Sequence, residues 1–337
     1  MDVRASCRAR QRTRGGSAGE LLALLLLGLL LCGRVPVAAA SGPRPIALGA
    51  YVSGAPWDPA KLDEFAALAG ARPSIAMWYQ DWASPGVREF DPAKMDAVAA
   101  RGAVPMVTWE PWDHRGGVAQ PDFALRAILA GKHDAYVRQW ARDAARWGRP
   151  MYLRFAHEMN GNWYPWSPGV NGNTRAEYAQ AWRYVARIFK QERAANVRWV
   201  WSPNVACGGC SPFADLYPGD AVVDWVGLDG YNWGASQSWS RWQEFEPLFR
   251  ASYDALAALT TRPMMVAETG ASELGGDKAT WIRQALLSDI PARFPRVQAV
   301  VWFHENKETD WRINSSPAAL AAYAAAAASP LYQGRLP

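Results

Sequence analysis

The sequence has few of the residues on which metal and redox chemistry depend. Only four His and four Cys occur among 337 residues. The chain has two His-Glu pairs, but Gly161 and Glu308 stand where an H-E-x-x-H zinc motif requires its second His. A zinc knuckle built on Cys207 and Cys210 would need a second pair of ligands, and none is evident. We therefore expect no metal ion and no cofactor.

Beyond its first forty residues the chain also lacks an excess of charge of either sign. The formal net charge is +5, and residues 1–40 hold six Arg against Asp2 and Glu20, which accounts for +4 of it. Residues 41–337 therefore carry only +1. A nearly neutral body has no field to attract a polyanion, so we expect no nucleic-acid partner.

The sequence offers only one long apolar run, and it lies near the N-terminus. Leu21–Cys32 contains nine Leu and follows an Arg-rich segment. The run is shorter than the roughly 18 residues that a membrane-spanning helix needs, and Ala38-Ala39-Ala40 supplies an A-x-A cleavage site before Ser41. We predict a signal peptide over 1–40, a short linker over 41–45 and a secreted protein. An uncleaved membrane anchor is the alternative.

Two of the four cysteines lie in the predicted mature chain, in the sequence Cys207-Gly-Gly-Cys210. An exported chain meets an oxidising compartment, and two glycines allow so short a loop to close on itself. We therefore predict a local disulfide between Cys207 and Cys210.

From residue 46 onward, short apolar segments alternate with amphipathic ones. This pattern is typical of parallel strands that are buried on both faces and separated by helices. Eight such strands within residues 46–330 predict one α/β domain, a single (β/α)₈ TIM barrel. The predicted strands are 46–52, 74–79, 103–109, 150–156, 196–203, 222–227, 263–267 and 297–303.

The helices are expected over 58–69, 91–101, 133–147, 174–194, 241–259, 277–293 and 317–328, with a short helix or turn over 212–217. Thr174 and Glu177 form a capping-box pattern at the start of the fourth of these. The rival fold, a doubly wound open sheet, would be expected to carry G-x-G-x-x-G after its first strand. Residues 49–54 do not match that pattern.

Tryptophan is abundant, with 19 in the chain. Several, including Trp78, Trp109 and Trp163, lie at or just after the C-terminal ends of predicted strands, where working residues gather in such barrels. Flat aromatic faces can cover the apolar face of a sugar ring, while nearby carboxylates and amides bond its hydroxyls. The pattern favours a carbohydrate cleft, whereas Trp140, Trp147 and Trp182 on predicted helices are interpreted as core.

Two glutamates follow predicted strands directly. Glu158 comes after the fourth strand and Glu268 after the seventh, 110 residues later. Closure of a barrel would set them opposite each other across its mouth. Two opposed carboxyl groups are what glycoside hydrolysis requires, one to protonate the leaving oxygen and one to attack the anomeric carbon or activate water.

One segment of the sequence resembles the signature of a known family. The segment Arg154-Phe-Ala-His-Glu-Met-Asn-Gly-Asn-Trp-Tyr-Pro-Trp166 resembles the signature of glycoside hydrolase family 26, secreted (β/α)₈ enzymes that act mainly on β-1,4-mannans. The similarity continues through 226–233, 267–270 and 301–302. It implies a retaining double displacement, with Glu158 as the acid/base and Glu268 as the nucleophile.

The resemblance further implies that His157 and Tyr231 are polar partners of these carboxyl groups and that Trp163 and Trp302 are sugar platforms. The full predicted substrate-binding set is His157, Asn160, Trp163, Trp166, Tyr231, Trp302, Trp109 and Trp78. The favoured activity is a mannan endo-1,4-β-mannosidase working as a monomer on a polysaccharide. Mixed-linkage β-1,3-1,4-glucan and xylan are alternative substrates of the same family, and a carbohydrate-binding barrel without catalysis is the alternative of another class.

Overall fold

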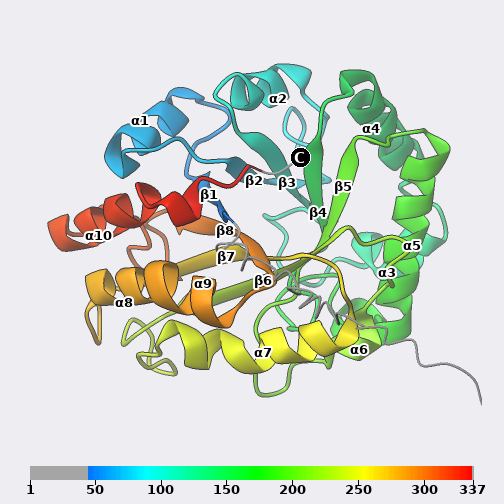
Figure 1. Ribbon diagram of the computed structural model, residues 1–337. Coiled ribbons are helices and arrows are strands. Elements are labelled where there is room, and N and C mark those ends of the chain that lie inside the picture. Colours follow the sequence, from blue (N-terminus) through cyan, green and yellow to red (C-terminus); the bar gives the residue numbers. More distant parts are fainter. Residues whose placement is uncertain (1–44, 336–337) are drawn as a thin grey trace, which may run out of the picture. The chain divides into compact units, whose positions relative to one another are not determined.

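The computed structural model describes residues 45–335, so the predicted signal peptide and all but the last residue of the predicted linker lie outside the described residues. Eight parallel strands pair in sequence order and close into a barrel, because β1 pairs with both β2 and β8 (Figure 1). The strands are β1 (Ala47–Val52), β2 (Ile75–Asp81), β3 (Val104–Glu110), β4 (Met151–Phe155), β5 (Val197–Trp201), β6 (Trp225–Asn232), β7 (Met264–Ala271) and β8 (Val297–His304).

Helices surround this barrel on its outer side (Figure 1). They are α1 (Ala60–Ala69), α2 (Pro92–Ala99), α3 (Leu125–Leu129), α4 (Asp134–Trp147), α5 (Arg175–Gln191), α6 (Phe213–Leu216), α7 (Phe245–Leu259), α8 (Lys278–Gln284), α9 (Ile290–Arg293) and α10 (Pro317–Ala327). Four shorter turns of helix are η1 (Pro121–Phe123), η2 (Val170–Gly172), η3 (Ala285–Asp289) and η4 (Pro330–Tyr332). Within residues 45–335 no helix has the length and apolar character that crossing a membrane would need.

The predicted (β/α)₈ barrel is confirmed, although several elements differ from their predicted bounds. Strands β6 and β7 continue four or more residues beyond their predicted ends. The helix predicted over 277–293 is divided into α8, a π-helical turn and α9. Helix α3 and turn η1 were not predicted at all. The capping box of α5 is present, with Thr174 Oγ1 accepting from the Glu177 N–H.

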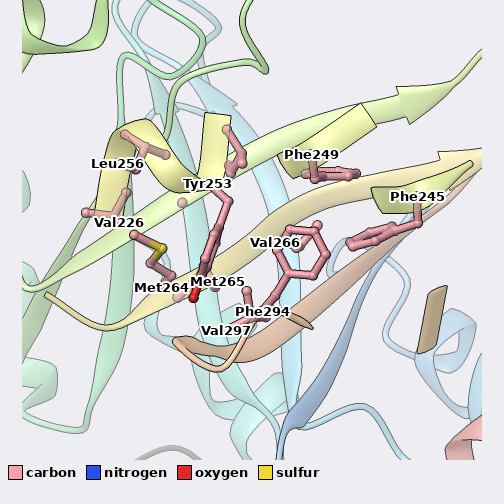
Figure 2. A pocket seen from close by; sticks show the side chains of 12 residues that line it. Val226, Phe245, Phe249, Tyr253, Leu256, Met264, Met265, Val266, Phe294 and Val297 are labelled. Atoms are coloured by element: carbon pink, nitrogen blue, oxygen red, sulfur yellow. The ribbon is translucent and has the colours of Figure 1, made fainter. Parts of the chain in front are cut away.

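The core has two layers, because successive side chains of each strand alternate between the two faces of the barrel wall. A small inner cluster fills the barrel and includes Met77, Met106, Tyr152 and Met265. A much larger outer cluster lies between the strands and the helices. Figure 2 shows part of this outer layer, where the aromatic side chains of α7 face β6 and β7. The void enclosed there, about 10 Å³, is lined by apolar side chains and belongs to the core.

Cys207 and Cys210 form a disulfide in the segment that joins β5 to α6. The bridge closes a loop of four residues, and the Cys210 N–H also donates to the Cys207 carbonyl over 3.1 Å. So short a cross-link constrains little of the unfolded chain, and its effect is therefore local.

Candidate active site

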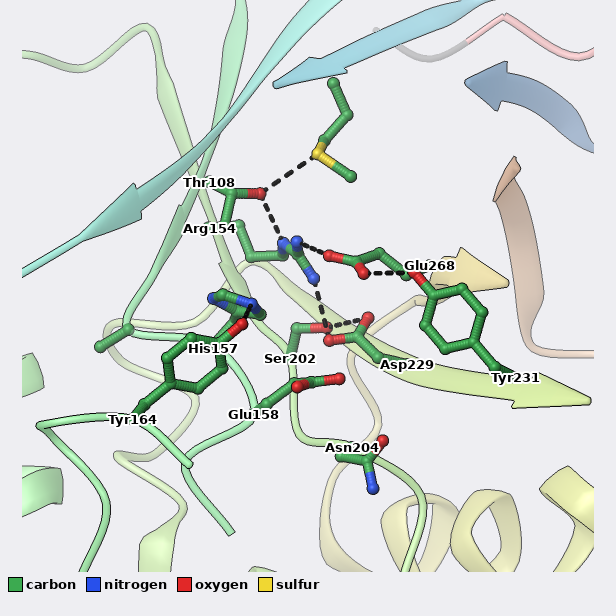
Figure 3. A network of polar contacts seen from close by, with 12 residues as sticks. Thr108, Arg154, His157, Glu158, Tyr164, Ser202, Asn204, Asp229, Tyr231 and Glu268 are labelled. Carbon is green, nitrogen blue, oxygen red and sulfur yellow. Dashed lines mark hydrogen bonds and ion pairs between the residues drawn. The ribbon is translucent and has the colours of Figure 1, made fainter. Parts of the chain in front are cut away.

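The strand ends of β3, β4, β6 and β7 bring one polar network together at the mouth of the barrel (Figure 3). At its centre is Arg154, a fully buried side chain of β4. On this strand Tyr152 belongs to the inner cluster and Leu153 to the outer one, so alternation directs Arg154 into the barrel. A buried guanidinium is tolerated only where it is paired and hydrogen-bonded.

Arg154 meets that requirement with three contacts. Its Nε donates to Thr108 Oγ1 over 2.9 Å, and its Nη1 donates to Asp229 Oδ2 over 2.9 Å. Its Nη2 pairs with Glu268 Oε1. Ser202 Oγ in turn donates to Asp229 Oδ1 over 2.9 Å, so the aspartate is held from both sides.

An extra residue in β7 aims Glu268 at this network. Met265 and Ala267 both belong to the inner cluster, so strict alternation would turn Glu268 outward, toward the helices. The pairing instead skips from Leu228–Val266 to Asp229–Glu268, and the strand shows the same shift against β8. This β-bulge points a second consecutive side chain into the barrel, which is a known use of bulges beside active sites.

Both oxygens of Glu268 are engaged. Arg154 binds Oε1, and the Tyr231 hydroxyl donates to Oε2 over 2.6 Å. The two donors come from β4 and β6 and hold the carboxylate as an oriented anion with only 4% of its surface exposed. Hydrogen bonds to an ionised acceptor are the stronger kind, so this carboxylate is prepared for attack on an electrophilic carbon.

Glu158 lies in a different environment, three residues beyond the end of β4. Its backbone N–H donates to the Ser202 carbonyl over 2.7 Å, and its φ is 49°, in the left-handed region. One side-chain oxygen accepts from the Trp163 indole N–H over 2.8 Å. Burial, reinforced by the negative charge of Glu268, raises the pKa of Glu158 to about 7. This carboxyl group can therefore hold a proton near neutral pH and release it.

His157, directly before Glu158 in the chain, is buried and uncharged. The Tyr164 hydroxyl lies 3.0 Å from its Nε2, and the Trp166 indole N–H donates to its backbone carbonyl over 2.7 Å. Burial and the nearby Arg154 cation hold the pKa of His157 well below its usual range. The residue fixes the turn that carries Glu158, and only 1% of its surface is exposed.

The structure places most of the predicted sugar-binding tryptophans elsewhere. Trp78, Trp109 and Trp302 alternate with inner-cluster residues and therefore face the outer layer, where at most 3% of each is exposed. Trp166 is fully buried as well. These four indoles present no face to a sugar ring, and we assign them to the core.

Asn160 also has another task. Its side chain bonds the backbone of Asn204 twice, accepting from the N–H and donating to the carbonyl, each over 2.9 Å. It thus ties the loop after β4 to the loop after β5. Of the predicted substrate-binding set, only Trp163, 38% exposed, and the half-buried Tyr231 remain open to the mouth.

Four functional residues were not assigned a role from the sequence: Arg154, Thr108, Asp229 and Glu110. A signal for Arg154 was available, since a charged residue within an apolar strand must be paired. Glu110 ends β3 on the inward-facing side, in register with Asp81, and 5% of it is exposed. Burial raises the pKa of Glu110 to about 8. Glu110 therefore holds its proton at pH 7.

The arrangement thus contains an anionic carboxylate held by two donors, a second carboxyl group that exchanges a proton near pH 7, and an exposed indole beside the latter. The sequence model for glycosyl hydrolase family 26 matches residues 126–273, the stretch that contains Arg154, Glu158, Asp229, Tyr231 and Glu268. The chain belongs to glycosyl hydrolase family 26.

Relatives of known name differ in how much of this chain they align with. Endoglucanase H of Acetivibrio thermocellus is 42% identical over 284 residues, which are 82% of this chain and 30% of that protein. A mannan endo-1,4-beta-mannosidase of Bacillus subtilis is 28% identical over 156 residues, 44% of this chain and 38% of the relative. The chain thus spans less than half the length of either relative.

Among solved structures, a family 26 β-mannanase from Bacteroides ovatus matches with a TM-score of 0.62 and 18% identity. The match covers 86% of this chain and 90% of that one. At this level of identity the likeness shows that the two chains share a fold.

Proposed function

We propose that the chain is a retaining endo-β-glycanase in which Glu268 is the nucleophile and Glu158 the acid/base. The observation that carries this proposal is the unequal environment of the two carboxyl groups. Glu268 is bound through both oxygens by Arg154 and Tyr231, whereas Glu158 has one donor, Trp163, and a raised pKa. Glycosidases divide the two roles between carboxyl groups that lie in different surroundings.

In the first step the proton of Glu158 passes to the glycosidic oxygen as the bond from that oxygen to the anomeric carbon breaks. A Glu268 oxygen attacks the same carbon and forms a covalent glycosyl-enzyme. In the second step Glu158, now a carboxylate, takes a proton from water, and the resulting hydroxide equivalent displaces Glu268. The Tyr231 hydroxyl and Arg154 receive the negative charge of the departing carboxylate.

The substrate we favour is a β-glucan. Of the two relatives described above, Endoglucanase H aligns with 82% of this chain at 42% identity, whereas the Bacillus mannosidase aligns with 44% at 28% identity. β-Mannan is the second candidate, because 154–166 resembles the family signature and because solved structures of the same fold include β-mannanases. The chain covers 30% of Endoglucanase H, so the name of that protein supports a substrate class and nothing finer.

We further propose that the protein is exported. The Cys207–Cys210 disulfide supports this, since such bridges persist in oxidising compartments. Mass spectrometry of protein recovered from the medium should give a chain that begins at Ser41. A retained Leu21–Cys32 segment would contradict cleavage.

The direct test is turnover by residues 41–337 on mixed-linkage glucan, glucomannan, galactomannan and xylan, with the products sized. We expect rapid shortening of the glucan. Glu268→Gln and Glu158→Gln are the matched variants, since each keeps the shape and removes the acid, and both should lose at least about a thousandfold in kcat. Cleavage of mannan alone would reverse the order of substrates. Binding without any cleavage by the unmodified chain would contradict the enzyme and favour a carbohydrate-binding barrel.

A further inference from the structure

The most exposed large apolar side chain among the described residues is Trp239, with 70% of its surface open. It lies in the segment 233–244, which follows β6 and leads to α7. Segments after barrel strands lie at the same face as the polar network described above. A single exposed tryptophan is not unusual on a protein surface, so its neighbours decide what it means.

Trp239 stands at the outer end of a row of aromatic rings that begins at the nucleophile. The Tyr231 hydroxyl binds Glu268, and the Tyr231 ring lies 6.2 Å from Trp233, centre to centre. Trp233 then lies 5.2 Å from Trp239. Trp311, 4.9 Å from both Tyr231 and Trp233, backs the row. Two ring-to-ring steps therefore lead from the reacting carboxylate to solvent.

The segment that carries Trp239 is held in place by polar contacts rather than left loose. Asn232 Oδ1, at the end of β6, accepts from the backbone N–H groups of Gly234 and Gln243 over 3.2 and 3.0 Å. Ser240 Oγ donates to the Gly234 carbonyl over 2.8 Å. One side-chain oxygen thus joins both ends of the loop, and the indole at its tip is presented in a fixed place.

Burial of the Trp239 ring would stabilise the fold, and leaving the ring exposed forgoes that stabilisation. Its ring is inclined at 58° to Trp233, and at 70% exposure much of its surface is left open. A preformed aromatic surface loses little conformational entropy when a ligand covers it. Sugar rings, with apolar faces and polar edges, are the ligands that suit such a surface beside a glycosidase centre.

We propose that Trp239 and Trp233 form a distal sugar-binding platform, which holds a pyranose unit of the β-glycan beyond the two units that flank the bond cleaved. This inference rests on the proposed function, because the row of rings starts at Glu268. The platform gives the enzyme a preference for long chains over short ones, and it favours cleavage within a polymer.

The experiment compares Trp239→Ala with the unmodified chain on a soluble β-glucan and on an aryl β-glycoside with a single sugar, which fills only the two places that flank the bond cleaved. The short substrate does not reach Trp239. The platform predicts a rise of about three- to tenfold in KM for the polymer, as expected for loss of one aromatic contact, with the ratio of polymer to aryl activity falling accordingly. Trp239→Phe keeps a flat ring and should recover most of the difference.

The matched control is Trp57→Ala. Trp57 is also an exposed indole, 46% open, but the Lys94 ammonium group lies 5.5 Å from the centre of its ring, and Trp57 does not belong to the aromatic row that starts at Glu268. An equal change in polymer KM for Trp57→Ala and Trp239→Ala would overturn the proposal, as would an unchanged KM for Trp239→Ala. Inactivity of the unmodified chain on both substrates would instead be a failure of the proposed function.

Binding measured without turnover removes any effect of the chemical step. In a Glu268→Gln background, calorimetry with the same glucan should show the affinity falling when Trp239 is also replaced by Ala. The alternative is that Trp239 contacts a second copy of the chain. Sedimentation without sugar tests this by measuring the molecular mass in solution. A change in mass on Trp239→Ala would assign the ring to that contact and overturn the platform.

Discussion

Glu158 has a backbone conformation that few residues other than glycine adopt. Its φ is 49°, and that of Ala156 is 46°, so two left-handed residues enclose His157. Each such residue costs on the order of 1–3 kcal/mol and persists where the surroundings determine it. Here the Ser202 carbonyl accepts the Glu158 N–H, and Trp166 binds the His157 carbonyl. The sequence carries no glycine at these positions, so this turn was not predictable from residue preferences.

The indole of Trp163 contacts Glu158, the proposed acid/base, and also lines the mouth of the barrel. Its N–H bond to Glu158 favours the ionised carboxyl and opposes the burial that raises the pKa to about 7. Because the first step needs Glu158 protonated, kcat/KM should fall as pH rises through this pKa. Trp163→Phe keeps the ring and removes the donor, so the falling limb should move to higher pH.

The quantity to compare is the pH at which kcat/KM falls, and not the maximum value of kcat/KM. Loss of contact with the sugar also lowers that maximum. Trp57→Phe serves as the control and should leave the limb where it is. A limb that stays in place in Trp163→Phe would mean that this hydrogen bond does not govern the proton on Glu158.

The buried carboxyl group of Glu110 makes the stability of the fold depend on pH. Its pKa, raised by burial from 4.5 to about 8, means that between these values the folded state binds a proton that the unfolded state has lost. Stability should therefore fall as pH rises from about 4.5 to 8, and the penalty is absent below that range. Glu110→Gln, a neutral isostere, should flatten the decline. Urea unfolding at pH 5 and pH 8 measures it.

The exposed Glu64→Gln is the matched control for Glu110→Gln, since the Glu64 side chain is 60% open. It should keep the slope of the unmodified chain. Equal slopes for all three proteins would show that Glu110 is ionised in the fold and that the argument from burial is wrong.

At the scale of elements, β6 and β7 show why strand ends were misjudged. Both strands were predicted to end at residues 227 and 267, shortly before Asp229 and Glu268, because polar residues are typical of loops. In the barrel the pairing continues to Asn232 and Ala271, because these side chains are satisfied by Arg154 and Tyr231. The bulge at Ala267 leaves no mark in the pattern, so the inward aim of Glu268 was not predictable from alternation.

For the tryptophans near strand ends, in contrast, the sequence does contain the information needed to predict their orientation. Alternation along β2, β3 and β8 already directs Trp78, Trp109 and Trp302 to the outer layer, beside inner residues such as Met77 and Val301. These tryptophans were predicted to bind sugar because they lie near strand ends. The alternation of side chains between the two faces of the strand was not considered, and the prediction was therefore wrong. The two-residue period of the strands by itself predicts that these three side chains face the helices.

Helix α8 anchors the segment after β8 through one buried cation. The Lys278 ammonium group donates to the carbonyls of Asp310 and Arg312, each over 2.9 Å, and to Ser315 Oγ over 2.8 Å. Lys278→Met fills similar space but leaves two carbonyls without this donor. We expect a loss of about 2–4 kcal/mol in unfolding free energy.

Faster amide exchange within residues 305–316 should accompany that loss, since the segment is released locally. Lys61→Met, which removes an exposed i,i+3 pair with Glu64, should cost little. If the two substitutions were equally mild, the buried ammonium group would not be the anchor of this segment.

For the whole molecule, closure of the barrel is what creates the site. Arg154, Asp229 and Glu268 come from β4, β6 and β7 and meet only when the eight strands form a ring. The alternation of strands and helices was enough to predict that ring and so to set Glu158 and Glu268 at one mouth. The roles of the two glutamates came from the family resemblance, and the guanidinium that links the strands became evident only in three dimensions.

The central claim is that Glu268 attacks and Glu158 exchanges the proton, and azide separates these roles in one measurement. The substrate is an aryl β-glycoside whose phenolate leaves without protonation. In Glu158→Ala, Glu268 still forms the glycosyl-enzyme, which accumulates for want of a base. Azide needs no deprotonation, so it should restore turnover and give the β-glycosyl azide. In Glu268→Ala, azide takes the place of the missing carboxylate and gives the α-glycosyl azide. The β-azide from Glu268→Ala together with the α-azide from Glu158→Ala would contradict the assignment.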